Sequence, residues 1–326
     1  MYKIQILMTT YNLEKYVETA IMSVVNQKTT YKYKLMVVDD CSTDSTFEIV
    51  EKLKNRFPDL IEAYRNEANK GSLASSNFLF NKIDAEYYSF LDGDDFWNDE
   101  NYIQEGIAFL DNNSAFSMYG GNTILLNSNG DKQFLIRPNK TNKQYDLEDQ
   151  IKDRMPFVHT SSIIARNILF KEGLPKVFKE KENTFENCAL RGEDFRRIHN
   201  LVFGPIYVSK KIRSTYRIHD QGMWQGSSLF KRKVETAIQD NFLKKYFSSA
   251  GKDELSRYYK RRFKCSFNEL SLHILFNKES LCAKKSEKDI QLLCSLLSDI
   301  QSGNLSSKTT FLDKVKRKII SFMLNH

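Results

Sequence analysis

The stretch Ser89-Phe90-Leu91-Asp92-Gly93-Asp94-Asp95-Phe96-Trp97 is an apolar segment that runs into three carboxylates. We predict a buried strand with an acidic cluster at its carboxyl end. Carboxylates gathered in one place repel each other unless a cation lies among them. Mg²⁺ and Mn²⁺ take such oxygen ligands, commonly together with phosphate oxygens. The stretch therefore indicates a metal–diphosphate site, in which Gly93 lets the backbone approach a ligand. The alternative is an acidic turn that caps the next helix, with Asp95 or Asn98 as the N-cap.

Upstream of this stretch, apolar segments alternate with segments of helical spacing. We expect strands at 3–8, 33–38, 60–65 and 87–91, and helices at 14–27, from 45 through 54 and from 72 through 83. This alternation predicts an α/β fold with a mostly parallel, doubly wound sheet. Ligands of such sheets bind beyond the carboxyl ends of the strands. The polar residues expected at those ends are Thr9, Asp39, Asp40, Asn69, Gly71, Asp92 and Asp94.

Downstream, the pattern is less regular. We expect a helix at 99–110, a hairpin formed by 116–126 and 133–136, and a strand at 158–165. The polar segment 140–154 is predicted to be a mobile connection, and the charged segment 176–187 an exposed loop. Glu193 and Asp194 are expected to open a helix that runs through Leu201. Residues 206–218 read as one strand or a strand pair.

Composition indicates a folded protein. Hydrophobic residues make up 41% of the 326 positions and aromatic residues 13%, which excludes global disorder. The five cysteines are too scattered for a zinc site and indicate reduced thiols. The chain starts directly on a strand pattern, without a signal-peptide layout, and carries no apolar run of membrane-spanning length. We therefore expect a cytoplasmic protein, either free or peripheral on the cytoplasmic face of the inner membrane.

Charge is distributed unevenly along the chain. The net charge is +8, yet residues 230–326 alone contain 20 Lys and Arg against 10 Asp and Glu, which indicates an anionic partner for this part. Residues 310–324 have the pattern of a basic amphipathic helix, suited either to an anionic membrane surface or to packing on the protein itself. Nucleic acid is not expected, because no basic groove interleaved with aromatic residues is apparent.

Five motifs occur in a characteristic order: 6–12 (ILMTTYN), 37–44 (VVDDCSTD), 69–71 (NKG) with Asn77, 91–95 (LDGDD) and 192–194 (GED). Together they resemble the inverting family 2 glycosyltransferases of the GT-A fold, of the bacterial surface-polysaccharide type, over residues 3–220. The resemblance implies a Rossmann-like catalytic domain at 1–226, with helices on both sheet faces. Residues 1–97 would bind the nucleotide sugar and 98–226 the acceptor. Residues 227–326 would form a basic helical region that contacts a membrane or a second copy.

The resemblance also implies roles for individual residues on the donor side. Asp40 would accept the imide N–H of uracil, with Asp39 as the neighbouring candidate, and Asp92 would contact ribose or a metal-bound water. The donor-binding set comprises Thr9, Thr10, Tyr11, Asn12, Asp39, Asp40, Asn69, Gly71, Asp92 and Gly93.

For the metal, the resemblance implies Asp94 as the main ligand of Mn²⁺ or Mg²⁺, Asp95 as a second candidate, and His219 as a residue that completes the site. Asp194 would be the general base, with Glu193 beside it. Without the resemblance, both acids would read as ordinary charge at a helix N-terminus.

The acceptor side is the least defined. His159 and Thr160 are candidates to line it, and Trp224 is the candidate for a lid over the donor. One position departs from the family pattern, because Ser76 stands where relatives often have arginine. Lys70, Arg191 and Arg213 are the candidates to supply that cation.

These features predict transfer of a hexose or N-acetylhexosamine from a UDP-sugar to a hydroxyl of a glycan or lipid-linked glycan acceptor. A sugar nucleotidyltransferase would need a Gly-rich, basic N-terminal loop for a triphosphate, and residues 9–12 lack both features. A non-catalytic glycan- or membrane-binding protein on the same fold is the other alternative, which the complete set of acidic residues disfavours.

Overall fold

The computed structural model describes residues 1–191, 193–219, 222, 227–276 and 287–302. The chain divides into two compact units, one made of residues 1–182 and 190–225 and the other of residues 183–189 and 226–326. The predicted site residues all fall in the first unit.

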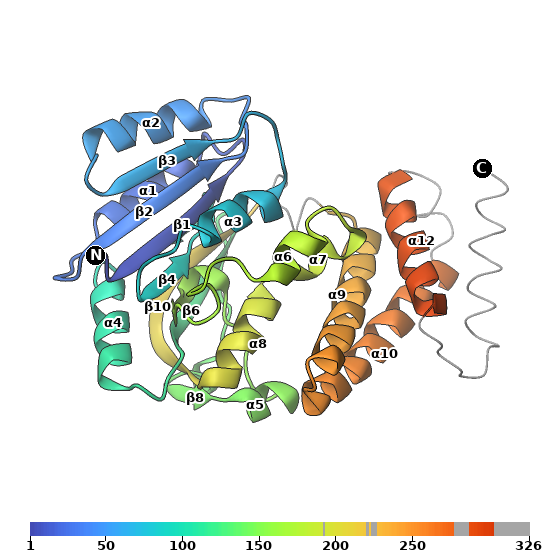
Figure 1. Ribbon diagram of the computed structural model, residues 1–326. Coiled ribbons are helices and arrows are strands. Elements are labelled where there is room, and N and C mark those ends of the chain that lie inside the picture. Colours follow the sequence, from blue (N-terminus) through green and yellow to red (C-terminus); the bar gives the residue numbers. More distant parts are fainter. Residues whose placement is uncertain (192, 220–221, 223–226, 277–286, 303–326) are drawn as a thin grey trace. The chain divides into compact units, whose positions relative to one another are not determined.

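The first half of the sheet is parallel. Strands β1 (Ile4–Thr10), β2 (Tyr33–Asp39), β3 (Ile61–Arg65) and β4 (Tyr87–Phe90) pair in the order β3-β2-β1-β4 (Figure 1). Parallel pairing brings their carboxyl ends to one edge of the sheet. The loops predicted to meet there do so.

The second half of the sheet is mixed. Strands β9 (Ile163–Arg166), β6 (Met118–Asn127), β10 (Ile206–Ile218) and β5 (Phe96–Trp97) continue the order from β4. Only β6 and β10 pair in parallel, so parallel pairing dominates before the acidic stretch and antiparallel pairing after it. Strand β10 is a single strand with register shifts between Val208 and Ser214. Strand β7 (Lys132–Phe134) forms the predicted hairpin with β6.

Helices cover both faces of the sheet. On one face, α1 (Val17–Val25), α2 (Thr46–Arg56) and α4 (Tyr102–Asn112) pack against alternate strand residues such as Ile4 and Ile6. On the other face lie α3 (Ser72–Phe80), α6 (Lys176–Lys181) and α8 (Glu193–Phe203) (Figure 1). These three helices contribute rings to an aromatic layer. The rings of Phe80 and Phe170 are stacked at 4.3 Å in this layer. Successive side chains of a strand point to opposite faces, and most residues of β1, β2 and β4 are buried because both faces are covered.

Two predicted loops are ordered structure instead. The supposed mobile connection at 140–154 holds β8 (Lys143–Tyr145), which pairs with β10, and α5 (Leu147–Ile151), which has a capping box. It is preceded by η1 (Pro138–Lys140). The supposed exposed loop at 176–187 holds α6 and η3 (Phe185–Asn187). The many charged residues of this segment led to the loop prediction, although Phe178 within it is fully buried against Phe80 and Phe195.

The strand predicted at 158–165 begins later than expected. Residues 160–162 form the 3₁₀ turn η2 (Thr160–Ser162), and β9 follows at Ile163. The side chain of His159 accepts a hydrogen bond from the Ser161 backbone and thereby caps this turn. Local bonding by polar side chains competes here with strand pairing.

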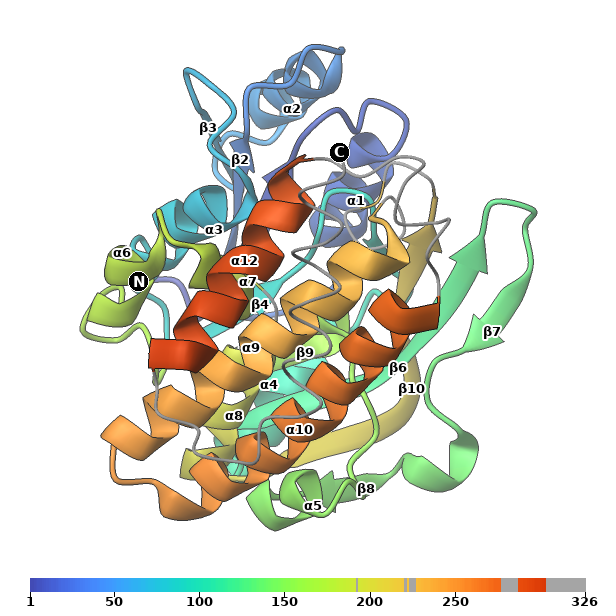
Figure 2. The same ribbon diagram turned by 90° about the vertical axis from the view of Figure 1, so that its right-hand side faces the viewer.

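The second unit is helical. Helices α9 (Leu229–Ser249), α10 (Asp253–Phe276) and α12 (Glu287–Ser302) enclose a core that includes Phe230, Ile238 and Leu296 (Figure 2). The short helix α7 (Cys188–Arg191) spans the boundary between residues 183–189 of the second unit and residues 190–225 of the first. The amphipathic segment predicted at 310–324 lies outside the described residues. None of the described helices combines the length and apolar character that crossing a membrane requires.

Candidate functional site

The loops that follow β1 and β2 are bonded to each other. Asn12 lies in the left-handed region at φ 54°, and its side chain accepts a hydrogen bond from the Thr43 backbone N–H at 2.8 Å. The Asn12 backbone N–H donates to Ser42 Oγ at 2.9 Å. The Leu13 N–H donates to Thr46 Oγ1 at 2.7 Å. The two loops therefore form one structural piece.

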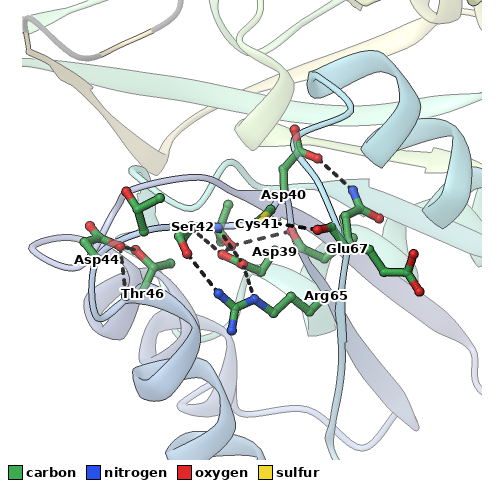
Figure 3. A network of polar contacts seen from close by, with 12 residues as sticks. Asp39, Asp40, Cys41, Ser42, Asp44, Thr46, Arg65 and Glu67 are labelled. Atoms are coloured by element: carbon green, nitrogen blue, oxygen red, sulfur yellow. Dashed lines mark hydrogen bonds and ion pairs between the residues drawn. The ribbon is translucent and has the colours of Figure 1, made fainter.

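Asp39 is fully buried within this piece. Its carboxylate accepts hydrogen bonds from Thr10 Oγ1 at 3.2 Å and from the Ser42 N–H at 2.9 Å, and it lies 3.5 Å from Arg65 Nε (Figure 3). Protein groups thus occupy both of its oxygens. The structure shows Asp39 shaping the loop rather than exposing a carboxylate.

Asp40 binds the loop at 66–71. Its carboxylate accepts hydrogen bonds from Asn66 Nδ2 at 2.7 Å, from the Lys70 N–H at 2.9 Å and from the Gly71 N–H at 2.8 Å. Gly71 has φ +85°, a conformation that glycine adopts without steric cost. The Asn69 side chain also accepts from Gly71, at 3.2 Å. Asp40, Asn69 and Gly71 are therefore brought together as one group.

Tyr11 and Thr9 complete the end of β1. The Tyr11 side chain is 45% exposed, so its ring face is available to a ligand. The Thr9 carbonyl accepts a hydrogen bond from the Gly93 N–H at 3.2 Å. A Cβ on Gly93 would lie 2.7 Å from Thr10 Cγ2, so glycine is required there for close contact with β1. The predicted close approach at Gly93 is thus to the neighbouring strand.

Asp92 is the first acid of the stretch, two residues after the end of β4. It is partly buried, and no group of the described residues donates a hydrogen bond to it. Burial, followed by the neighbouring charge of Asp94, raises the pKa of Asp92 to about 7, although Arg196 opposes the shift. The charge of Glu193 also contributes to this pKa, so the start of α8 lies close to the end of β4.

Asp94 and His219 meet across the sheet. Asp94 Oδ2 lies 3.0 Å from His219 Nε2, and the Tyr16 ring packs 4.7 Å from the imidazole ring. Arg217 donates through Nη1 to the Asp94 carbonyl at 2.5 Å, and its guanidinium lies 4.5 Å from the Phe96 ring centre. His219 Nδ1 is buried without a hydrogen-bond partner in the described part of the chain. The pair is the predicted main metal ligand with its predicted completing residue.

Asp95 points into the sheet instead. It is fully buried, its Oδ1 accepts a hydrogen bond from the Arg217 N–H at 3.1 Å, and its Oδ2 lies 3.7 Å from His159 Nδ1. Burial and the charges of Asp94 and Asp92 raise its pKa. Within the described ranges, no group of three or more His, Cys, Asp and Glu is arranged to hold a metal. Among the described residues, Asp94 and His219 place one carboxylate and one imidazole side by side as potential metal ligands.

His159 lies next to the buried carboxylate of Asp95. Its Nδ1 is 2.6 Å from Ser161 Oγ, and its ring stacks on Tyr216 at 4.6 Å. Burial lowers the pKa of His159 to about 4, so the ring is neutral at pH 7. Thr160 Oγ1 faces α8 and lies 3.5 Å from Arg196 Nη2. The predicted lid residue Trp224 lies outside the described residues.

Glu193 and Asp194 occupy the first turn of α8, as predicted, and arginines follow one turn later. Arg197 forms a close ion pair with Asp194 and lies 3.9 Å from Glu193 Oε1. Burial raises the pKa of Glu193. The first turn of α8 thus brings Glu193 within electrostatic reach of Asp92, and the buried Arg197 guanidinium holds Asp194.

The sequence of this site matches a known family. Residues 5–174, slightly more than half of the chain, match the model described as Glycosyl transferase family 2. The chain belongs to this family.

Two curated relatives and one solved structure illustrate the likeness. The uncharacterized protein Rv1520 of Mycobacterium tuberculosis is 21% identical over 223 residues, which cover 68% of this chain and 61% of the relative. The poly(ribitol-phosphate) beta-N-acetylglucosaminyltransferase TarS of Staphylococcus aureus is 35% identical over 115 residues, 34% of this chain and 19% of TarS. The matches thus span about three fifths or less of these relatives' length.

The solved structure establishes the fold class. The structure of S. aureus TarS 1–349 in complex with UDP aligns over 98% of this chain and 88% of that one, with 20% identity and a TM-score of 0.56. The fold of this family 2 member is therefore GT-A, with a helical C-terminal region, as the motifs predicted.

Four residues of this family 2 site were missed from sequence: Tyr16, Arg196, Arg197 and Arg217. Periodicity could have found three of them, since Arg217 precedes His219 by two residues at the end of a predicted strand. Arg196 and Arg197 likewise follow Glu193 and Asp194 by three residues on a helix. Tyr16 comes from a distant part of the chain, and no local pattern marks it.

Of the three cations proposed in place of an arginine at Ser76, Arg213 is committed to other partners. Arg213 is fully buried and bonded to Asp99, Glu105 and Tyr119. Lys70 is exposed and reaches Asp40 only through its backbone N–H. The Arg191 side chain lies outside the described residues.

Proposed function

We propose that this family 2 member is an inverting, metal-dependent glycosyltransferase. It moves a hexose or N-acetylhexosamine from a UDP-sugar to a hydroxyl of a glycan or lipid-linked glycan acceptor. One observation carries the proposal: the Asp94–His219 pair, the Asp92 carboxylate and Glu193 at the start of α8 lie together just beyond the end of β4. The alternatives place no demand on this combination of groups.

Several features support a UDP-sugar donor. Tyr11 offers an exposed ring on which a base can stack, and the Asp40-bound loop at 66–71 flanks the ends of β1 and β2. A related chain, TarS, is named as an N-acetylglucosaminyltransferase and has been solved with UDP. Asp92, which receives no hydrogen bond from the described residues, is free to accept one from a hydroxyl of ribose or sugar.

Asp94 and His219 would hold the metal ion. A carboxylate together with an imidazole would suit Mn²⁺, and phosphate oxygens would supply further ligands. The bound ion supplies charge neutralisation to the departing nucleotide diphosphate. Tyr16 and Arg217 fix the positions of the two ligands.

Asp194 would act as the general base. Inversion requires a single displacement at the anomeric carbon, so the base must lie opposite the diphosphate and take the proton from the acceptor hydroxyl. The ion pair with Arg197 holds the Asp194 carboxylate in one orientation. His159 and Thr160 lie beside this part of the site, and their placement supports an acceptor-side role.

A direct test measures UDP release from a panel of UDP-sugars with Mn²⁺, with and without short glycan acceptors. We expect one donor to be turned over and to raise the melting temperature of the protein. A protein that neither binds UDP with Mn²⁺ nor releases it would instead support a non-catalytic binding protein on the same fold.

Replacing Asp94 with alanine should abolish metal-dependent donor binding. Loss of the carboxylate ligand is expected to weaken UDP affinity in Mn²⁺ by about 100-fold or more. Isothermal titration with and without Mn²⁺ measures this. Asp131→Ala makes the same change in the exposed turn between β6 and β7 and should bind UDP normally. If Asp94→Ala keeps its Mn²⁺ dependence, the ligand assignment is wrong.

The basic second unit supports an anionic membrane as partner, at the cytoplasmic face of the inner membrane. Helix α10 exposes Arg257, Lys260, Arg261 and Lys264, which are spaced to lie on one side of the helix. Each cation near an anionic surface contributes about 1 kcal/mol. An additional contact through 310–324, or with a second copy of the chain, stays a proposal.

Changing Arg257, Lys260 and Lys264 together to glutamine should therefore weaken binding to phosphatidylglycerol vesicles by about 100-fold at low salt. Co-sedimentation measures the effect. The matched control changes the exposed Lys52, Lys132 and Lys176 of the first unit and should bind as the parent does. Equal binding by the α10 variant would dismiss this surface as the membrane contact.

A further inference from the structure

Arg196 is a buried cation without a carboxylate partner. Its side chain is 7% exposed, and among the described residues no carboxylate oxygen lies within ion-pair distance of it. The guanidinium lies 5.1 Å from the ring centre of Phe80 and 5.5 Å from that of Phe90. Its one hydrogen bond, from Nη2 to Thr160 Oγ1, is long at 3.5 Å.

A second buried arginine, Arg213, differs from Arg196 because carboxylates of the protein neutralise its charge. Arg213 is ion-paired with Asp99 and Glu105, donates to the Tyr119 hydroxyl and lies over two tyrosine rings. Arg196 has the rings but none of the carboxylates. Asp92 and Glu193 are near enough to feel its charge, yet neither reaches its N–H groups.

The energies are unequal. Burial of a cation without an ion-pair partner is costly, and two aromatic rings and one long hydrogen bond offset that cost only in part. Arginine cannot escape this cost by losing its proton. The guanidinium is therefore poised for an anion, and its planar fork suits a carboxylate or a phosphate with two oxygens.

We propose that Arg196 is the anion-binding residue for the donor, at a subsite between Asp92 and the first turn of α8. This inference rests on the proposed function. The anion is a carboxylate or phosphate group of the nucleotide sugar, and it has two sources: the diphosphate itself, or an acidic sugar such as a hexuronic acid. Thr160 and the rings of Phe80 and Phe90 hold the guanidinium in place.

The test compares the parent protein with Arg196→Gln and Arg196→Lys by isothermal titration in Mn²⁺. Four ligands are used: uridine, UDP, UDP-glucose and UDP-glucuronic acid. Arg137→Gln is the matched control, because it removes the same charge from an exposed loop. Melting temperatures establish that each variant is folded. If Arg196→Gln does not fold, Arg196→Lys carries the test, since it keeps the charge and loses the fork.

We expect Arg196→Gln to weaken binding by about 10- to 100-fold and Arg196→Lys by about 10-fold, with uridine unaffected. Equal weakening of UDP and both sugar nucleotides assigns Arg196 to the diphosphate. Weakening of UDP-glucuronic acid alone assigns it to an acidic sugar. Parent-like affinity for all three nucleotides, or an equal loss of uridine binding, would overturn the proposal. A parent protein that binds no UDP would instead refute the proposed function.

Discussion

Asp194→Asn should reduce turnover by about 10²- to 10⁴-fold and leave UDP affinity within about twofold of the parent. The amide keeps the shape of the side chain but cannot take the proton of an acceptor hydroxyl. Donor binding depends on groups at the ends of β1, β2 and β4 and should persist. Initial rates of transfer and titration with UDP measure the two quantities separately.

Glu193→Gln is the matched control for this prediction. It neutralises the neighbouring acid, which lies 3.9 Å from Arg197, whereas Asp194 forms the close pair with that residue. We expect it to retain most of its turnover. An active Asp194→Asn, or a larger loss in Glu193→Gln, would assign the base to another residue. Because both changes alter a partner of the buried Arg197, the melting temperatures of both variants must be compared with that of the parent.

Arg213→Met should destabilise the first unit by about 3 kcal/mol. Arg213 is fully buried, and its removal leaves Asp99 and Glu105 without their shared cation. The estimate stays at the lower end for a buried pair because both carboxylates are partly exposed, at 19% and 33%, and water can solvate them. Gly121 makes room for this side chain, since a Cβ there would lie 2.4 Å from Arg213 Cγ. Urea unfolding followed by Trp97 fluorescence measures the loss.

Lys211→Met provides the comparison on the same strand and the same carboxylate. Lys211 also pairs with Glu105 but is 52% exposed, so its removal should cost less than about 1 kcal/mol. If the two variants lose equal stability, burial of Arg213 is not what gives its ion pairs their value.

At acidic pH, the free energies of unfolding of the parent and of Arg213→Met should become more similar. Burial raises the pKa of Glu105, but hydrogen bonds from Lys211 and Arg213 outweigh it and hold that pKa below its ordinary value. A carboxyl with a depressed pKa stabilises the fold above its unfolded pKa, about 4.3, and loses this contribution as pH falls through the folded value. Unfolding measured at pH 7 and below pH 4 should show the convergence.

The sequence predicted the parts of the molecule that local patterns encode. The alternation of residues 3–91 gives the four parallel strands, and five ordered motifs give the family and the fold. The pairing of Asp94 with His219 was expected only through the family resemblance. The two residues are 125 positions apart, and no spacing along the chain implies their contact.

The sequence-based predictions were wrong where charged or polar residues suggested an exposed position but the structure packs the segment or side chain inward. Residues 176–187 are charged, yet the single side chain of Phe178 fixes them to the aromatic layer. Asp95 looks like Asp94 in sequence but alternates with it, and the turn into β5 sends it inward to the backbone of β10. Arg196 looks like ordinary helix-surface charge until the rings of Phe80 and Phe90 are in place around it.

Asp40 has a consequence for attempts to alter nucleotide preference. Its two carboxylate oxygens already accept hydrogen bonds from Asn66, Lys70 and Gly71. The residue that would read the base therefore also fixes the conformation of the 66–71 loop. A substitution of Asp40 meant to accept a different base would also remove the hydrogen bonds that hold this loop. If Asp40 reads the base, nucleotide preference and the structure of the 66–71 loop would change together on substitution, and a redesign would have to rebuild the loop first.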